Sequence, residues 1–346
     1  MSTTETTRSP QLADSVRLTD DGVHILDRRV FPFEHRWVHA STVEDVATAI
    51  ETMVTQSSGP YFAALWGMVL AAREAAPLDA ETAWRRMVAA GDRLIATRPT
   101  NDHLGRAVGR VLDAARDAEP GGLVDAALAG AHAGDADYRR RSQAVVEAAA
   151  TLLPDEAVVL THCWGDLLLT STVSAAQRQG KHLAFFCTET RPYLQGARLT
   201  AETLAEMGVD TTLITDGMGA ALFRDGKVDA LITASDGVPR DGQVVTKAGT
   251  LQLAVAAHTF GVPFHALCHA PDPRANTAED VPIEHRDGDE VLTTAGHRTA
   301  SHRVRGHSPA FDITPARFVA TVVTDRGPFD PEALHTYPAH GDRGAE

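Results

Sequence analysis

Five short apolar segments between residues 157 and 269 each lead into a polar or ionisable side chain: Cys163, Glu189, Asp216, Asp236 and His269. Thiols, carboxylates and imidazoles are groups that transfer protons in enzymes. Helix-like segments separate the apolar ones, and this alternation predicts a mostly parallel sheet with right-handed crossovers. Ligands of such an α/β sheet bind outside the carboxyl ends of its strands. We therefore expect the five side chains to lie along one edge of the sheet.

Each of these side chains also has a structural interpretation. A buried cysteine often packs as a small apolar residue, but a helix starting near Cys163, or the adjacent His162, would lower the pKa of the thiol. Asp236 follows the strand-like ALITAS segment. It either caps the next turn or, facing an apolar cleft, has a raised pKa and acts as an acid or base. Asp216 precedes a glycine and a helix, which is typical of ordinary capping.

The most unusual string is TETRPYLQGAR, residues 188–198, which places Arg191 and Arg198 between a strand and a helix. It is either a solvated loop or an anion-binding turn, because guanidinium groups bind phosphate in a bidentate manner. Lys247, just before a predicted helix, would add a second cation near a helix N-terminus. Arg98 is a further candidate of the same kind.

No metal or redox cofactor is expected. The string HALCH, residues 265–269, contains possible ligands, but alternation along a strand sends His265 and Cys268 to opposite faces. A zinc site needs more ligands at defined spacing. The chain has neither a GxGxxG dinucleotide fingerprint nor a GxxxxGK[ST] phosphate loop.

Composition narrows the class of protein and its partners. The 346 residues carry a formal net charge of −14, which argues against nucleic acid and against an anionic membrane surface. No apolar run approaches the roughly 20 residues that span a bilayer. The N-terminus has no apolar core of a secretory signal. Three cysteines fit free thiols in a reducing, cytoplasmic compartment.

The elements that must position these side chains form two predicted domains. Asp21 and Gly22 lie between β-prone segments, which indicates a hairpin, and Thr42 with Asp45 forms a capping-box pattern. An almost wholly apolar helix begins near residue 62. We predict a mobile N-terminus at residues 1–16 and a domain of a hairpin and helices at residues 17–145. A Rossmann-like domain follows at residues 146–330, with helices at 200–208 and 249–260 and a last strand FVATVVTD. Residues 331–346 are predicted to form a polar tail.

Several strings resemble the methylthioribose-1-phosphate isomerase family, together with ribose-1,5-bisphosphate isomerases and the regulatory subunits of translation initiation factor 2B. The strings that show this resemblance are THC at 161–163, ETRPYLQGARLT at 189–200, the segment from Asp229 to Asp236 and KAGT at 247–250. The likeness extends to RPT at 98–100, VPIE at 281–284 and PAFDITP at 309–315. It covers about residues 20–325.

The resemblance implies a small N-terminal domain followed by a Rossmann-like domain, a homodimer, and an aldose–ketose isomerase that needs no cofactor. It implies acid–base catalysis by Cys163 and Asp236 on a small sugar phosphate, as in methionine salvage. By the same resemblance Gln195 and Lys247 would bind that sugar phosphate, and Arg98 would contact it from the N-terminal domain. Asp236 would be the principal acid or base and Cys163 the second proton-transfer group, with the order open. Site-lining candidates are Glu189, Arg191, Arg198, Asp216 and His269.

Three departures from the family pattern indicate an altered pocket. The Arg-Gly-Ala-Pro loop of the isomerases corresponds to residues 55–60, which contain no arginine and leave Ser57, Ser58 and Gly59 as candidates. The usual Asn-Lys pair is Thr246-Lys247, and the usual Asp-Arg pair is Asp236-Gly237. In addition, Trp164 replaces a small polar residue. The alternatives are therefore an isomerase acting on a differently 5-substituted ribose 1-phosphate, related chemistry on another sugar, or a non-catalytic binding protein.

Overall fold

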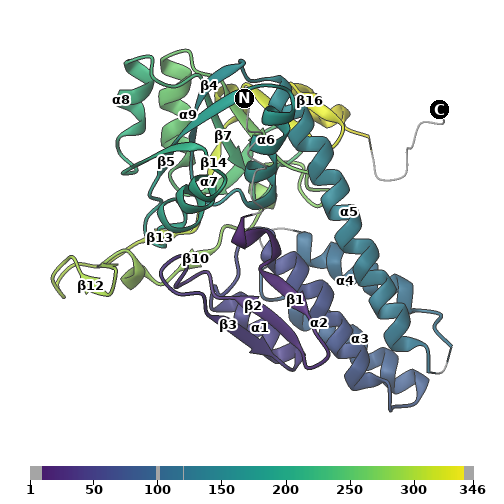
Figure 1. The fold of residues 1–346 in the computed structure, drawn as a ribbon. Helices are drawn as coiled ribbons and strands as arrows, with labels where there is room; N and C mark the ends of the chain where they lie inside the picture. Colours follow the sequence, from purple (N-terminus) through teal and green to yellow (C-terminus); the bar gives the residue numbers. More distant parts are fainter. Residues whose placement is uncertain (1–9, 99–101, 120, 339–346) are drawn as a thin grey trace, which may run out of the picture. The chain divides into compact units, whose positions relative to one another are not determined.

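The computed structural model describes residues 10–98, 102–119 and 121–338 (Figure 1). The chain divides into two compact units, Met1–Arg141 and Ser142–Glu346, close to the predicted boundary. The long helix α5 (Leu123–Thr151) contains this division. Residues 99–101, which include part of the RPT string, lie outside the described residues.

The first unit begins with a small antiparallel sheet. Its strands are β1 (Val16–Leu18), β2 (Val23–Leu26) and β3 (Trp37–Ala40), in that order. The predicted turn at Asp21-Gly22 joins the first two strands, whereas the third strand was not predicted. The 3₁₀ helix η1 (Gln11–Asp14) precedes them and buries Leu12, within the segment expected to be mobile.

Four helices of this unit follow the sheet: α1 (Val43–Glu51), α2 (Gly59–Ala75), α3 (Ala80–Ile95) and α4 (His103–Ala115). The predicted capping box is present, because Thr42 accepts a hydrogen bond from the Asp45 N–H and the Asp45 side chain accepts one from the Thr42 N–H. Helix α2 is buried along nearly its whole length, as its composition predicts, and packs against α3 and α4.

The second unit is built on a seven-stranded sheet with the order β16-β15-β9-β7-β4-β5-β6. All pairs are parallel except β15–β16, so the predicted Rossmann-like, mostly parallel sheet is confirmed. The edge strand β16 was not predicted. The strands are β4 (Glu156–Thr161), β5 (His182–Thr188), β6 (Asp210–Ile214), β7 (Ala230–Ala234), β9 (Phe264–Leu267), β15 (Thr321–Thr324) and β16 (Gly327–Phe329).

Helices cover both faces of this sheet. Alternate residues of β4 and β7 belong to two apolar clusters, one shared with α5 and α6 and the other with α8 and α9. The helices are α6 (Asp166–Arg178), α7 (Glu202–Glu206), α8 (Gly219–Arg224) and α9 (Thr250–Thr259). The predicted helix at 200–208 differs, because a π-helix, η2 (Gly196–Ala201), precedes α7.

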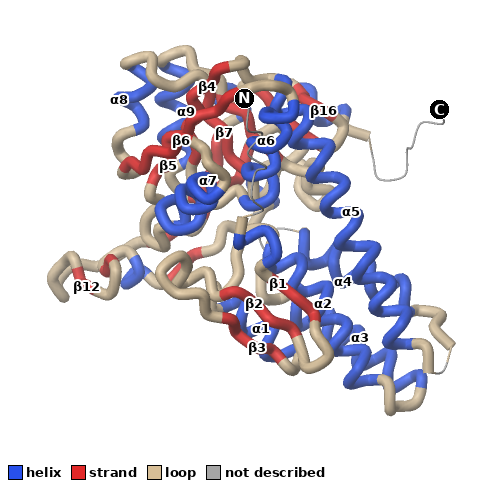
Figure 2. Tube along the Cα trace, viewed as in Figure 1, coloured by secondary structure: helices blue, strands red, loops and turns tan. Residues whose placement is uncertain are grey.

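Shorter elements lie beside the main sheet (Figure 2). The strand β8 (Val244–Lys247) pairs with β14 (Phe311–Thr314) in antiparallel register. The remaining elements are η3 (Ala278–Asp280), β10 (His285–Arg286), η4 (Gly288–Glu290), β11 (Thr293–Thr294), β12 (His297–Arg298), β13 (Ser308–Pro309), η5 (Ala316–Phe318) and η6 (Pro331–Thr336). The last one lies where a polar tail was predicted, and it buries Leu334. None of the described helices is long and apolar enough to cross a membrane.

Candidate active site at the strand ends

The sheet brings Cys163 and Asp236 to neighbouring strand ends. Cys163 follows β4 and Asp236 follows β7, and these two strands are paired in parallel register. Paired strands lie about 4.8 Å apart. The positive charge of Lys247 and the negative charges of Asp236 and Asp216 all act on the Cys163 thiol. Four of the residues singled out in the sequence therefore converge at one edge of the sheet.

The backbone around Cys163 is held in an unusual conformation. Cys163 has a φ of 66°, and positive φ values are also found at Asp166 and, in the turn after β5, at Thr190 and Leu194. Such conformations persist only where surrounding contacts impose them, and they concentrate at functional sites. Here the Cys163 N–H donates to Thr190 Oγ1 at 2.9 Å, and the Thr200 hydroxyl donates to the Cys163 carbonyl. These two threonines fix the position of the thiol.

The expected activation of this thiol by a helix N-terminus is wrong. Burial raises the pKa of Cys163 to about 11, because desolvation of the thiolate outweighs the attraction of Lys247. Helix α6 begins only at Asp166. At neutral pH the side chain is therefore a thiol that can donate a proton, not a thiolate nucleophile.

His162 is a neutral imidazole that connects two segments of the chain through hydrogen bonds. It is therefore not the cation that was expected to lower the pKa of Cys163. Its Nε2 lies 3.0 Å from the Ala248 carbonyl, which can only accept, so Nε2 carries the proton. Its Nδ1, 2.7 Å from Thr188 Oγ1, then accepts from that hydroxyl. Burial lowers the pKa of His162, which favours the neutral ring. A Cβ on Gly249 would come within 2.9 Å of this imidazole, so the residue before α9 must be glycine.

Asp216 holds the turn after β5. Its carboxylate accepts hydrogen bonds from the Thr190 N–H at 2.7 Å and the Arg191 N–H at 2.8 Å. The expected capping of the following helix is wrong, because α8 has Met218 as its N-cap and no side-chain cap hydrogen bond, and the Asp216 carboxylate binds the turn after β5 instead. The guanidinium of Arg191 donates to three backbone carbonyls, and Arg198 Nε donates to the Tyr193 carbonyl. Both arginines therefore brace the loop, and their role in anion binding stays a prediction.

Several buried polar atoms at this edge lack partners in the part of the chain that the structure describes. Gln195 is only 2% exposed, and its Oε1 accepts no hydrogen bond from any described residue. A Cβ on the next residue, Gly196, would come within 1.7 Å of the Thr188 carbonyl, so the turn packs tightly around Gln195. The same absence of a partner is found for side-chain atoms of Trp164, Ser235 and Thr246. Such groups suit a ligand rich in hydroxyl groups.

Lys247 is buried, and no described residue forms an ion pair with it. It is 9% exposed, and its ammonium lies 5.7 Å from the ring centre of Tyr193 and 5.1 Å from that of Phe311. Among the described residues Lys247 has neither a hydrogen bond nor a salt bridge through this nitrogen. Buried charges are normally paired. The site therefore provides a desolvated cation that favours an anionic ligand.

Asp312, which sequence reasoning did not single out, joins the site from β14. Its carboxylate accepts hydrogen bonds from the N–H groups of Gly249 at 2.7 Å and Leu251 at 3.2 Å, at the N-terminus of α9. Burial raises its pKa to about 6 even though these bonds and the charge of Lys247 oppose the shift. An aspartate inside PAFDITP gave no local signal, because its partners are distant in sequence.

The raised pKa of Asp312 predicts a pH-dependent stability. The folded protein holds this proton more tightly than the unfolded chain, so the contribution is complete below pH 3.8 and is lost as pH rises through about 6. We expect Asp312→Asn to remove this loss, on the order of 3 kcal/mol at neutral pH. Urea unfolding of both proteins at mildly acidic and neutral pH measures it. An unchanged pH dependence in the variant would contradict the assignment.

Six further candidates have contacts that do not test the role expected of them. Arg98, at the end of α3, points its Nη1 to within 3.1 Å of Met53 Sδ in the first unit. His269 Nε2 lies 2.8 Å from Ser142 Oγ of α5, and Glu189 is half-buried after β5. Ser57, Ser58 and Gly59 precede or begin α2.

The loop at residues 55–60 contains no arginine, but an arginine from another part of the first unit contacts it. Arg28 is 1% exposed beneath this loop. It donates to the Gln56 carbonyl and, at 2.7 Å, to Ser15 Oγ. A Cβ on Gly59 would come within 3.2 Å of its Nη2. The loop is therefore held by a guanidinium that the sequence string alone does not contain.

Together these features define a class of protein: a Rossmann-like domain with a candidate small-molecule site, where a thiol, a carboxylate and a buried lysine meet at the strand ends.

Comparison with known proteins specifies the class further. The Initiation factor 2 subunit family matches residues 57–331. A methylthioribose-1-phosphate isomerase of Pelotomaculum thermopropionicum is 36% identical over 330 residues, covering 91% of each chain. One from Anaeromyxobacter dehalogenans is 37% identical, covering 92% of this chain and 93% of its own.

Solved structures give the same result. The 5-methylthioribose 1-phosphate isomerase of Pyrococcus horikoshii has a TM-score of 0.82 at 30% identity, covering 95% of this chain and 97% of its own. The delta subunit of translation initiation factor eIF-2B from A. fulgidus has a TM-score of 0.78 at 32% identity, covering 92% and 96%. The chain belongs to the Initiation factor 2 subunit family, and it is an enzyme of the isomerase type within it.

Proposed function

We propose that the protein is an aldose–ketose isomerase that converts a 5-substituted ribose 1-phosphate, of the methylthioribose 1-phosphate type, to the corresponding ribulose 1-phosphate. The observation that carries the proposal is the convergence of Cys163, Asp236 and Lys247, whose ammonium has no ion pair among the described residues. A thiol and a carboxylate supply the two proton transfers that the isomerisation requires. A buried ammonium suits the phosphate.

The chemistry starts from a constraint of the substrate. The phosphate locks a ribose 1-phosphate as an acetal, so the ring must open with the phosphate attached. The ring oxygen gains a proton as its bond to C1 breaks, hydrogen moves from C2 to C1, and the 2-hydroxyl loses a proton to become the ketone. One proton is given and one is taken, so no external oxidant or reductant is needed.

The protonation state of the thiol supports one order of events. Because the pKa of Cys163 is about 11, the thiol enters the cycle protonated and donates to the ring oxygen. Asp236, as a carboxylate, takes the proton of the 2-hydroxyl. Transfer of that proton from Asp236 to Cys163 restores the starting state. In this order Cys163 is the acid and Asp236 the base, which is one of the two orders that the resemblance leaves open.

A second candidate is the same chemistry on a different sugar. It is favoured by the loop at residues 55–60, which Arg28 supports from beneath and which presents the exposed Ser57 in place of an arginine. Thr246 is 1% exposed and its hydroxyl has no partner among the described residues, which leaves a donor for a ligand hydroxyl.

A C2-deuterated substrate panel tests the proposal. Ribose 1-phosphates with different 5-substituents, free riboses and ribose 1,5-bisphosphate are incubated with the protein. We expect a ketose 1-phosphate from at least one 5-substituted ribose 1-phosphate. Deuterium found at C1 of the product indicates a hydride shift, and its loss to solvent indicates an enediol route. Binding without any ketose would instead support a non-catalytic regulator.

A further inference from the structure

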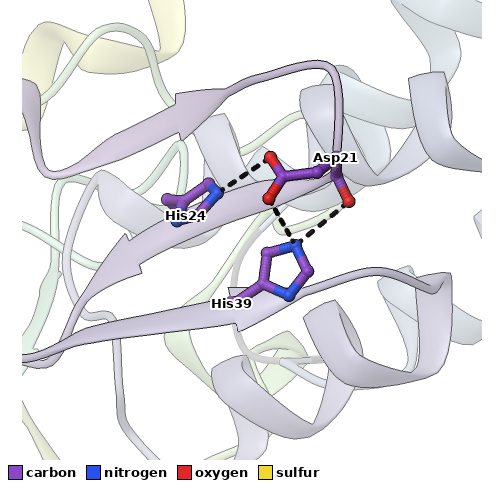
Figure 3. A group of neighbouring side chains, drawn as sticks. All are labelled: Asp21, His24 and His39. Carbon is purple, nitrogen blue, oxygen red and sulfur yellow. Dashed lines mark hydrogen bonds and ion pairs between the residues drawn. The ribbon is translucent and has the colours of Figure 1, made fainter.

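A cluster of two histidines and one aspartate lies on the outer face of the small sheet in the first unit (Figure 3). Within the described part of the chain it is the one group of three His, Cys, Asp or Glu side chains whose ligand atoms all lie within 4.8 Å of one another. We propose that Asp21, His24 and His39 form a binding site for a divalent transition-metal ion such as Zn²⁺. It does not depend on the proposed isomerase reaction.

The register of the strands brings the two imidazoles together. His24 on β2 and His39 on β3 are direct partners across the antiparallel pair, and their ring centres lie 4.9 Å apart. Side chains opposite one another on one face have Cβ atoms about 5 Å apart. Val23 and Ile25 flank His24 in the strand and are fully buried, so the histidines face outward.

Asp21 closes the site from the β1–β2 turn. Its carboxylate lies 3.2 Å from His24 Nε2 and 3.5 Å from His39 Nε2, and the latter nitrogen is also 3.0 Å from the Asp21 carbonyl, a hydrogen bond that a bound metal ion would replace. Two imidazole nitrogens and a carboxylate that converge in this way match the ligands that Zn²⁺ accepts, with a solvent-exposed position left for water. Nitrogen ligands favour Zn²⁺, Co²⁺, Ni²⁺ or Cu²⁺ over Mg²⁺ or Ca²⁺.

The surroundings orient the carboxylate and keep the site open. Thr19 Oγ1 donates to Asp21 Oδ1 at 2.6 Å, an outer hydrogen bond of the kind that positions metal ligands. Arg73 of α2 donates to the carbonyls of Thr19 at 3.0 Å and Asp20 at 3.2 Å and fixes the turn.

Two neighbouring residues are compatible with a bound cation. A Cβ on Gly22 would come within 2.7 Å of His39 Nε2, so glycine at this turn leaves room for the ring. Arg17 is the cross-strand partner of His24 and carries a positive charge. Its guanidinium is paired with Asp14 at 2.8 Å and lies 4.5 Å from the Trp37 ring centre. Its charge is therefore partly balanced before a metal binds.

Metal titration of the full-length chain tests the site. Protein treated with a chelator and dialysed is titrated with Zn²⁺ by calorimetry and with Co²⁺ by visible absorption. We expect one high-affinity equivalent in the wild type and a rise in Tm with Zn²⁺, because a ligand that binds only the folded state stabilises it. Losing even an outer partner weakens metal affinity about 10–100-fold, so His39→Ala and His24→Ala should weaken it at least that much.

The matched control is His302→Ala, which removes an exposed imidazole of the second unit, outside the cluster. It should bind Zn²⁺ as the wild type does. If a histidine variant fails to fold, Asp21→Asn, which changes one exposed turn side chain, replaces it. Either absence of binding by the wild type, or equal binding by the control and the cluster variants, would overturn the proposal. Isomerase activity is not the readout, so its presence or absence leaves this result unaffected.

Discussion

Asp236→Asn should lower turnover by about 10²–10⁴-fold, the usual contribution of a positioned general base. Asparagine keeps the shape of the side chain but cannot accept the proton of the 2-hydroxyl. Cys163→Ser should have a comparable effect, because a hydroxyl is a much weaker acid than the thiol that it replaces. Neither change should unfold the protein, since the backbone at Cys163 is held by Thr190 and Thr200 and not by the sulfur.

Turnover is measured on the substrate identified from the deuterated panel, with Tm recorded for each variant. Two matched controls separate the reacting pair from general effects of charge and thiol removal. Asp225→Asn removes an exposed carboxylate at the end of α8, and Cys187→Ala removes a buried thiol from β5. Both should turn over substrate at close to the wild-type rate. Full activity of Asp236→Asn and Cys163→Ser with the true substrate would exclude them as the acid and base.

The order of strands and helices in the second unit could be read from the sequence because periodicity is a local property. The apolar segments ending at Cys163 and Asp236 predicted parallel strands, and the structure pairs them as β4 and β7. The edge strand β16 was missed. It is three residues long, contains Pro328, and has no apolar alternation of its own.

What the sequence could not provide were the consequences of burial and of long-range hydrogen bonds. The side-chain partners of Arg191 are carbonyls about 100 positions away, at Val291 and Thr293, so its loop-bracing role has no local signal. The same holds for Asp312, whose carboxylate binds the start of α9. The thiol of Cys163 was expected to be acidic from its position near a helix, whereas its packing has the opposite effect on the pKa.

Lys247→Met should raise KM for a phosphorylated substrate by about 10–100-fold, because a hydrogen bond to a charged group contributes about 1.5–3 kcal/mol. Methionine has a similar length and keeps the contacts with Tyr193 and Phe311. It also removes a buried charge that has no ion pair among the described residues, so Tm should stay level or rise. A structural role for the ammonium would instead lower Tm.

The control for this variant is Lys227→Met, which removes an exposed ammonium near the end of α8. It should change neither KM nor Tm. The comparison that decides the role of Lys247 is between substrates, since a ribose lacking phosphate has no anion for the ammonium to bind. The wild-type preference for the phosphorylated sugar should shrink in Lys247→Met and persist in Lys227→Met. If Lys247→Met weakened both sugars equally, the buried ammonium would act on the shape of the pocket and not on the phosphate.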